Sequence, residues 1–269
     1  MTEAPANETG TPTPRYPLIS LQQVSMQFGA QRVLHALDLD VQRGQTLAVI
    51  GESGCGKTVL LKLLIGLLRP TVGRVVFDGK HLETLPEREL TQQRLRFGFL
   101  FQGAALFDSL PVWENVAFGL IQGRGMARTK ARDVAIEKLA KVGLTQDVAF
   151  LSPAELSGGM QKRVGLARAI AADPEIIFFD EPTTGLDPIM ADIINDLIIT
   201  TVKDVGATAL SITHDMVSAR KISDRIAMLY GGKIIWAGPT GQIDQSGNPY
   251  VEQFIHGRAE GPIKMAVKA

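Results

Sequence analysis

The amino-acid sequence predicts an α/β protein, because strand-like and helix-like runs alternate along most of its length. The strand-like run TLAVI (46–50) leads into a glycine-rich loop, and an apolar helix-like run follows at 57–68. The run EIIFFD (175–180) is apolar without alternation, which is typical of a parallel strand covered on both faces. The stretch 105–160 is mostly helical and contains a run that stops at Gly143. We therefore expect an α/β core with a helical insertion.

The other elements of the core follow from the same patterns. A strand-like run at 74–77 ends at the turn pair Asp78-Gly79, and two short strands are separated by the pair of glycines at 231–232. Additional strands are predicted at 18–24, 36–41, 97–101 and 207–213, and a helix from Pro188 onward.

Composition limits the partners and the compartment. Lysine plus arginine number 28 and aspartate plus glutamate number 28, so the formal net charge is zero. A neutral chain lacks the basic excess that drives binding to phosphate backbones, and we expect no nucleic-acid partner. The single cysteine, Cys55, excludes an internal disulfide and a multi-cysteine metal site, and fits a reducing compartment.

The sequence contains no apolar run of the roughly 20 residues that cross a bilayer. The longest such stretch, 59–68, contains Lys62 and is better interpreted as a buried helix. The chain does not open with a basic segment followed by an apolar one, as a secretory signal would. We therefore expect a soluble protein that stays in the cytoplasm.

A phosphate-binding loop is predicted at 51–58, where GESGCGKT fits the pattern G-x-x-x-x-G-K-[ST] between a strand and a helix. Backbone N–H groups of such a loop surround the β-phosphate, and the helix N-terminus adds partial positive charge. Lys57 would reach the β- and γ-phosphates, and the Thr58 hydroxyl would contact Mg²⁺. The alternative is a glycine-rich turn without a ligand, and Cys55 is expected to present only its backbone. The candidate nucleotide-binding residues here are Gly51, Ser53, Gly54, Cys55, Gly56, Lys57 and Thr58.

Two adjacent carboxylates follow the buried strand at 175–180. Asp180 at a strand end beside the phosphate loop is placed to hold Mg²⁺, and Glu181 can orient an attacking water as general base. Without the loop, such a pair would more often belong to a solvated turn.

The chain resembles the ATP-binding-cassette (ABC) ATPases over about 18–240, because LSGGMQ at 156–161 matches the signature motif of that family. The resemblance implies a P-loop NTPase (RecA-like) core, an N-terminal antiparallel β subdomain and an inserted helical subdomain at about 105–160. It also implies that Ser157, Gly158 and Gly159 close onto ATP held by a second copy of the chain. The alternative for this segment is a capped helix with a flexible entry.

Four further positions match the family pattern. Gln102 resembles the Q-loop glutamine that contacts Mg²⁺ or water, and His214 the switch histidine that bonds the γ-phosphate. Asp187 resembles the D-loop aspartate at the dimer seam, or is simply the N-cap before Pro188. Phe28 stands where the family stacks an aromatic ring on adenine, often a tyrosine, or is a core residue.

The domain limits follow from composition and from the extent of the resemblance. Residues 1–17 are rich in Thr, Pro, Ala and Glu, which predicts a flexible tail. Residues 18–247 are expected to form the ATPase domain, and 248–269 a C-terminal tail.

Two features indicate the type of cassette ATPase: the distance between the phosphate loop and the signature motif, and the sequence of three short segments. Only 101 positions separate Gly56 from Ser157 (157 − 56), which leaves no room for the long insertions of DNA-repair relatives, and ribosome-associated relatives usually carry two cassettes. A transporter subunit with a separate permease is therefore favoured. The segments QGAALF (102–107), VWENV (112–116) and NPYVEQF (248–254) are similar to ATPases of MCE (mammalian-cell-entry) lipid transporters, including Mla-type systems.

That closer resemblance implies phospholipid transport between bacterial membranes. The partners would be a permease and an MCE-domain lipid-binding protein, with this subunit bound peripherally to the cytoplasmic face of the inner membrane. An importer or exporter of another solute is the alternative, and a soluble ATPase acting on DNA or ribosomes is a further one. The apolar stretch 104–110 suggests a surface for the permease, unless Leu106 and Phe107 only anchor the helical subdomain.

Overall fold

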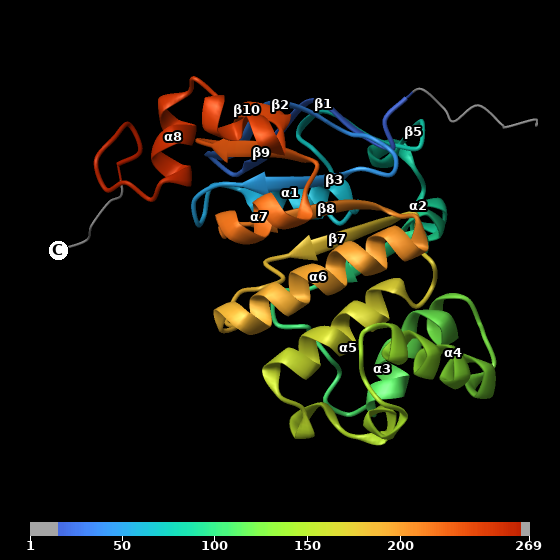
Figure 1. Ribbon diagram of the computed structural model, residues 1–269. Coiled ribbons are helices and arrows are strands. Elements are labelled where there is room, and N and C mark those ends of the chain that lie inside the picture. Colours follow the sequence, from blue (N-terminus) through green and yellow to red (C-terminus); the bar gives the residue numbers. More distant parts are fainter. Residues whose placement is uncertain (1–15, 265–269) are drawn as a thin grey trace, which may run out of the picture.

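The computed structural model describes residues 16–264, which form two sheets, a set of flanking helices and a helical lobe (Figure 1). The first sheet is antiparallel with strand order β2-β1-β4-β5. Its strands are β1 (Ile19–Phe28), β2 (Gln31–Val41), β4 (Val72–Phe77) and β5 (Lys80–His81). This sheet is the expected N-terminal β subdomain.

The second sheet has the order β10-β9-β3-β8-β7-β6, and all neighbours pair in parallel except β10 with β9. Strands β3 and β8 are buried along their whole length, which explains why their sequences do not alternate. The strands are β3 (Thr46–Ile50), β6 (Phe97–Leu100), β7 (Ile176–Asp180), β8 (Thr208–Thr213), β9 (Arg225–Tyr230) and β10 (Lys233–Pro239). The predicted α/β core is confirmed.

Helices flank the second sheet, and three of them form a separate lobe beside it (Figure 1). The lobe lies between β6 and β7 in sequence and consists of α3 (Val112–Phe118), α4 (Arg128–Lys141) and α5 (Gly158–Ile170). It matches the expected insertion at 105–160, except that α5 continues to residue 170. The other helices are α1 (Lys57–Leu64), α2 (Glu87–Arg94), α6 (Pro188–Val205), α7 (Met216–Ile222) and α8 (Pro249–Ile255).

Helix α5 joins the lobe to the sheet. Its buried residues Val164 and Ala167 share one core cluster with Leu139 of α4 and Phe179 of β7. A Cβ atom at Gly98 of β6 would lie 2.3 Å from the carbonyl oxygen of Ala169, so only glycine permits this close approach. This contact holds the C-terminal end of α5 against β6, on the sheet whose strand β7 leads to the predicted catalytic carboxylates.

The C-terminal segment differs from the expected tail. Asn248 caps α8 by accepting a hydrogen bond from the Tyr250 N–H at 3.0 Å. Val251 and Ile263 are buried in a cluster with Met228 of β9, so 248–264 pack on the second sheet. Residues 1–15 of the tail predicted at 1–17 lie outside the described residues. No described helix is long and apolar enough to cross a membrane.

Candidate functional site

A cleft of about 1080 Å³ lies where β3, β7 and β8 end, and it gathers most of the predicted site residues. The carboxyl ends of parallel strands meet at one edge of a sheet, so the loops that follow them come together. The predicted residues that line the cleft are Phe28, Ser53, Gly54, Gly56, Lys57, Thr58, Gln102, Asp180, Glu181 and His214. Phe28 is 46% exposed, so it is not the core residue that was considered as an alternative.

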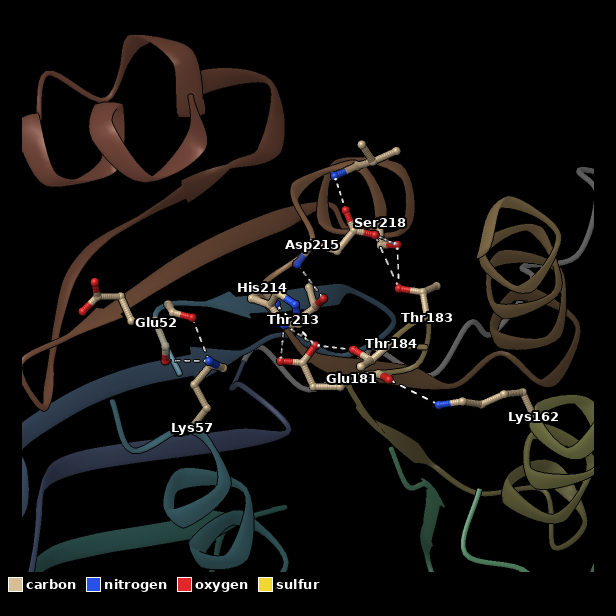
Figure 2. Close-up of polar contacts among 12 residues, drawn as sticks. Glu52, Lys57, Lys162, Glu181, Thr183, Thr184, Thr213, His214, Asp215 and Ser218 are labelled. Atoms are coloured by element: carbon tan, nitrogen blue, oxygen red, sulfur yellow. Dashed lines mark hydrogen bonds and ion pairs between the residues drawn. The ribbon is translucent and has the colours of Figure 1, made fainter. Parts of the chain in front are cut away.

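The phosphate loop connects β3 to α1 and is shaped by close backbone contacts. A Cβ atom at Gly51 would lie 2.3 Å from the carbonyl oxygen of Leu229 in β9. Lys57 is buried, and its Nζ donates hydrogen bonds to the carbonyl oxygens of Gly51 at 2.7 Å and Glu52 at 2.8 Å (Figure 2). No described side chain caps α1, and no acidic residue stands in its first turn. Its N–H groups are therefore available to an anion.

Cys55 completes this loop without a sign of redox chemistry. Burial raises the pKa of the Cys55 thiol, although the positive charge of Lys57 acts in the opposite direction. A thiol with a raised pKa remains protonated near neutral pH and is a poor nucleophile.

Glu181 and His214 meet in the cleft (Figure 2). The Glu181 carboxylate lies 2.9 Å from His214 Nδ1 and also accepts a hydrogen bond from Thr184 Oγ1 at 3.2 Å. The backbone of Glu181 has φ +49°, a left-handed conformation, and its N–H donates to the carbonyl oxygen of Ile212 at 2.9 Å. Such a conformation persists when the surroundings hold it, and it is often found at functional sites.

Three residues that line the cleft carry oxygen donors for a divalent cation. Thr58, Gln102 and Asp180 offer a hydroxyl, an amide and a carboxylate, which are the hard ligands that Mg²⁺ prefers. Burial, followed by the negative charge of Glu181, raises the pKa of Asp180. Among the described residues no group of three or more His, Cys, Asp or Glu could hold a metal ion. The donor set thus fits an ion that takes most of its ligands from phosphate and water.

A buried polar network behind the cleft was not predicted. Asp215 caps α7 through Oδ1, which accepts from the Val217 N–H at 2.9 Å, while its Oδ2 accepts from Ser218 Oγ at 2.6 Å. Ser218 also contacts Thr183 Oγ1 at 3.1 Å and accepts a hydrogen bond from Asn195 Nδ2 at 2.9 Å. The network connects the loop that contains Glu181 to the loop that contains His214.

The predicted signature residues lie away from this cleft. Ser157 caps α5, its Oγ accepting from the Met160 N–H at 3.3 Å, and Gly158 and Gly159 form the first turn. Asp187 caps α6, its Oδ1 accepting from the N–H groups of residues 189 and 190 at 3.0 Å each. None of these four residues lines the cleft of their own chain.

The segment after Gln102 is held from inside the lobe. The Asn115 side chain is fully buried, accepts from the Phe107 N–H at 2.7 Å, and donates to the carbonyl oxygens of Phe107 at 3.1 Å and Leu110 at 3.0 Å. Phe107 itself is 43% exposed and stacks on Phe118 with the ring centroids 4.6 Å apart. Leu106 is partly buried against the lobe. The loop is therefore rigidly anchored and still presents an aromatic ring.

The C-terminal segment provides a wall of the cleft that the sequence analysis missed. The Gln253 side chain accepts from the Ile263 N–H at 2.7 Å and donates to the carbonyl oxygens of Ile263 at 3.0 Å and Arg258 at 3.1 Å. The helix-start signal Asn248-Pro249 could have indicated α8. The residues of this wall are Gln253, Phe254, Gly257, Arg258, Ala259 and Ile263.

A phosphate loop beside a strand-end carboxylate pair, at the edge of a parallel sheet, defines a P-loop nucleoside-triphosphatase. The chain belongs to the ABC transporter family, because residues 34–184 match the family described as ABC transporter. It is an ATP-binding subunit that hydrolyses ATP.

Known relatives are similar over most of this chain. It is 40% identical, over 92% of its length and 71% of the relative, to the probable ribonucleotide transport ATP-binding protein mkl of Mycobacterium leprae. It is 38% identical, over 94% of its length and 95% of the relative, to the intermembrane phospholipid transport system ATP-binding protein MlaF of Haemophilus influenzae. Among solved structures, the dimeric bacterial cassette MJ0796 has a TM-score of 0.76 and 34% identity, covering 82% of this chain and 98% of that one.

Proposed function

We propose that this protein is the ATP-hydrolysing subunit of a transporter that moves phospholipids between bacterial membranes. One observation carries the choice of cargo: the similarity to proteins named for intermembrane phospholipid transport extends over nearly the full length of both chains, at 38% identity in Haemophilus influenzae and 36% in Escherichia coli. The permease and an MCE-domain lipid-binding protein would be separate chains. The subunit would bind peripherally to the cytoplasmic face of the inner membrane.

The working unit in this proposal is a head-to-tail dimer with ATP at the seam. The signature segment at 156–161 has a helix N-terminus but lies outside its own cleft, so the phosphate it would contact comes from a second copy. The structural similarity to a cassette described as dimeric, in one case in a post-hydrolysis state with ADP and phosphate, supports this arrangement. Ser157, Gly158, Gly159 and Asp187 would then complete the partner's site.

Each candidate residue of the phosphate loop and the cleft has a role in the proposed hydrolysis. Phe28 stacks on adenine, and the loop residues Gly51, Ser53, Gly54, Cys55 and Gly56 surround the phosphates together with Lys57. Thr58, Gln102 and Asp180 hold Mg²⁺. When bound, the cation neutralises charge that develops on the phosphate oxygens. Glu181 accepts a proton from the attacking water, and His214, whose ring contacts the Glu181 carboxylate, donates a hydrogen bond to the γ-phosphate.

The permease contact in this proposal is the loop after Gln102. Its backbone is fixed by Asn115 while Phe107 is exposed, which suits a surface that transmits motion to a partner. A rigid loop next to the catalytic cleft can move only together with the helical lobe.

Ribonucleotide transport is a second candidate, since relatives in mycobacteria carry that name at 40% identity. The two functions are separated by purifying the protein from detergent-solubilised membranes and reconstituting what accompanies it into vesicles. We expect a multi-helix permease, an MCE-domain protein and ATP-dependent transfer of labelled phospholipid. Ribonucleotide-stimulated ATPase activity with no lipid transfer would favour the second candidate. Recovery of DNA or ribosomes without a permease would contradict both.

A further inference from the structure

Lys162 is a buried lysine that follows the signature segment directly and does not line the nucleotide cleft. It lies in the first half of α5, and only 5% of it is exposed. A buried lysine usually requires a carboxylate partner, because removing an ammonium group from water is unfavourable. Lys162 forms no salt bridge with any described residue, whereas the equally buried Lys138 pairs with Asp173 at 2.5 Å.

The Lys162 ammonium instead contacts two backbone carbonyl groups of the catalytic loops. Its Nζ donates a hydrogen bond to the carbonyl oxygen of Gln102. It donates a second one, which Figure 2 shows, to the carbonyl oxygen of Glu181 at 3.4 Å. Helix α5 holds the loop after Gln102 at a second point, because Arg168 Nη1 donates to the carbonyl oxygen of Ala105 at 2.7 Å. Lys162 is thus the side chain that connects α5 to both loops at once.

The residue that Lys162 contacts in the second loop, Glu181, has an unfavourable left-handed backbone conformation. Glu181 has φ +49°, and its N–H is held by the Ile212 carbonyl at 2.9 Å. The carbonyl group of the same residue faces the Lys162 ammonium. With both ends of the residue restrained, its left-handed conformation and the direction of its carboxylate are fixed.

We propose that Lys162 is a positioning residue for ATP hydrolysis: it ties the signature helix of its own chain to the backbone carbonyls of Gln102 and Glu181, and so fixes the carboxylate that activates water. Lys162 does not touch the nucleotide and acts only through these two residues. Its removal therefore affects the rate of the chemical step far more than it affects nucleotide binding.

The test is Lys162→Met in the full chain, measured by steady-state ATPase kinetics and by equilibrium binding of a fluorescent ATP analogue. We expect kcat to fall on the order of 10²-fold through misplacement of the base, with KM and the dissociation constant nearly unchanged. Lys162→Arg, which keeps a buried cationic donor, should recover most of the lost kcat.

Lys138→Met is the matched control, since it removes another buried lysine of the same lobe that has no contact with the cleft. It should lower the thermal unfolding temperature and leave kcat per folded molecule unchanged. Wild-type kcat in Lys162→Met would overturn the proposal, and so would a loss of kcat that Lys138→Met reproduces for an equal loss of stability. If Lys162→Met does not fold, Lys162→Gln decides: reduced kcat with unchanged affinity supports the proposal, and wild-type kcat overturns it.

Discussion

The Glu181 carboxylate and the His214 ring are 2.9 Å apart although the residues are 33 positions apart and follow different strands. Strands β7 and β8 are adjacent and parallel, with Asp180 opposite Ile212, so the loops that follow them begin side by side. The Thr183–Ser218 contact at 3.1 Å ties the same two loops together further from the cleft. The Glu181 and His214 side chains are therefore restrained as one unit.

Glu181→Gln should bind ATP and almost stop hydrolysing it. An amide preserves the size of the side chain but cannot accept a proton from water, and general-base assistance contributes on the order of 10²–10⁴ in rate. ATPase activity and nucleotide affinity of the purified variant check this. Glu89→Gln, an exposed position on α2, is the control and should retain full turnover. Wild-type turnover in Glu181→Gln would remove Glu181 from its role.

A mixture of Lys57→Ala and Ser157→Arg chains should recover part of the ATPase activity that neither chain has alone. Lys57→Ala removes the buried charge that we propose holds the phosphates, and Ser157→Arg blocks the N-terminus of α5. In a head-to-tail mixed dimer, one site combines an intact phosphate loop with an intact signature, and the other site contains both lesions. The comparison is made at equal total protein concentration. Full activity of Ser157→Arg by itself would contradict a site shared between two chains.

Asp78→Asn should lower the free energy of unfolding near neutral pH. It should also make that free energy change less as the pH falls. Burial alone would raise the pKa of Asp78, but hydrogen bonds and charges from Arg96 and Arg43 outweigh burial and hold this pKa below its usual range. A depressed carboxyl pKa stabilises the fold above the unfolded value of about 3.9, and this contribution is lost as the pH falls through the lower folded value.

We expect Asp78→Asn to reduce the free energy of unfolding by about 1–2 kcal/mol at pH 7. The difference from the wild type should shrink below pH ~4, as measured by urea unfolding at a series of pH values. Asp133→Asn, at an exposed position that has no ion pair among the described residues, is the control. A difference that is constant with pH would mean that the ionised carboxylate contributes nothing.

The fold was predictable from the sequence where a strand is recognised by its own residues. The run TLAVI is fully buried and matches β3, and the run predicted at 175–180 starts one residue before the almost fully buried β7. The strand predicted at 18–24 ended too early, because β1 continues past an irregularity where Gln23 has φ +52° and the register shifts. Helices α2, α7 and α8 have only seven or eight residues and depend on tertiary contacts, which local patterns do not reveal.

The site was predictable for residues that directly follow a strand or form a motif. The polar contacts around it were not predictable, because Lys162, Ser218 and Gln253 acquire their hydrogen bonds only when separate segments pack together. The C-terminal segment was assigned to a tail for the same reason, since its wall against the cleft depends on burial of Val251 and Ile263 in the core.

Phe107→Glu distinguishes two roles for Phe107, which are contact with the permease and anchoring of the helical lobe. The ring is 43% exposed but stacks on Phe118, so both interpretations make a definite prediction. If Phe107 docks on the permease, a charge there should prevent assembly and lipid transfer. The thermal unfolding and nucleotide binding of the free ATPase should change little, because Phe107 does not line the cleft. If the ring anchors the lobe, the free protein should lose about 1–3 kcal/mol of stability.

The decisive measurement therefore pairs thermal unfolding of the free Phe107→Glu protein with phospholipid transfer by the reconstituted complex. Leu67→Glu, at a position that is 58% exposed outside the lobe, controls for the addition of a charge to the surface and should transfer lipid normally. We expect normal unfolding and lost transfer for Phe107→Glu, because a carboxylate in an apolar contact is left without a partner only when the permease binds. Normal transfer by Phe107→Glu would rule out this loop as the link. If the wild-type complex hydrolyses ATP without moving lipid, the assignment of the cargo fails while the ATPase assignment remains.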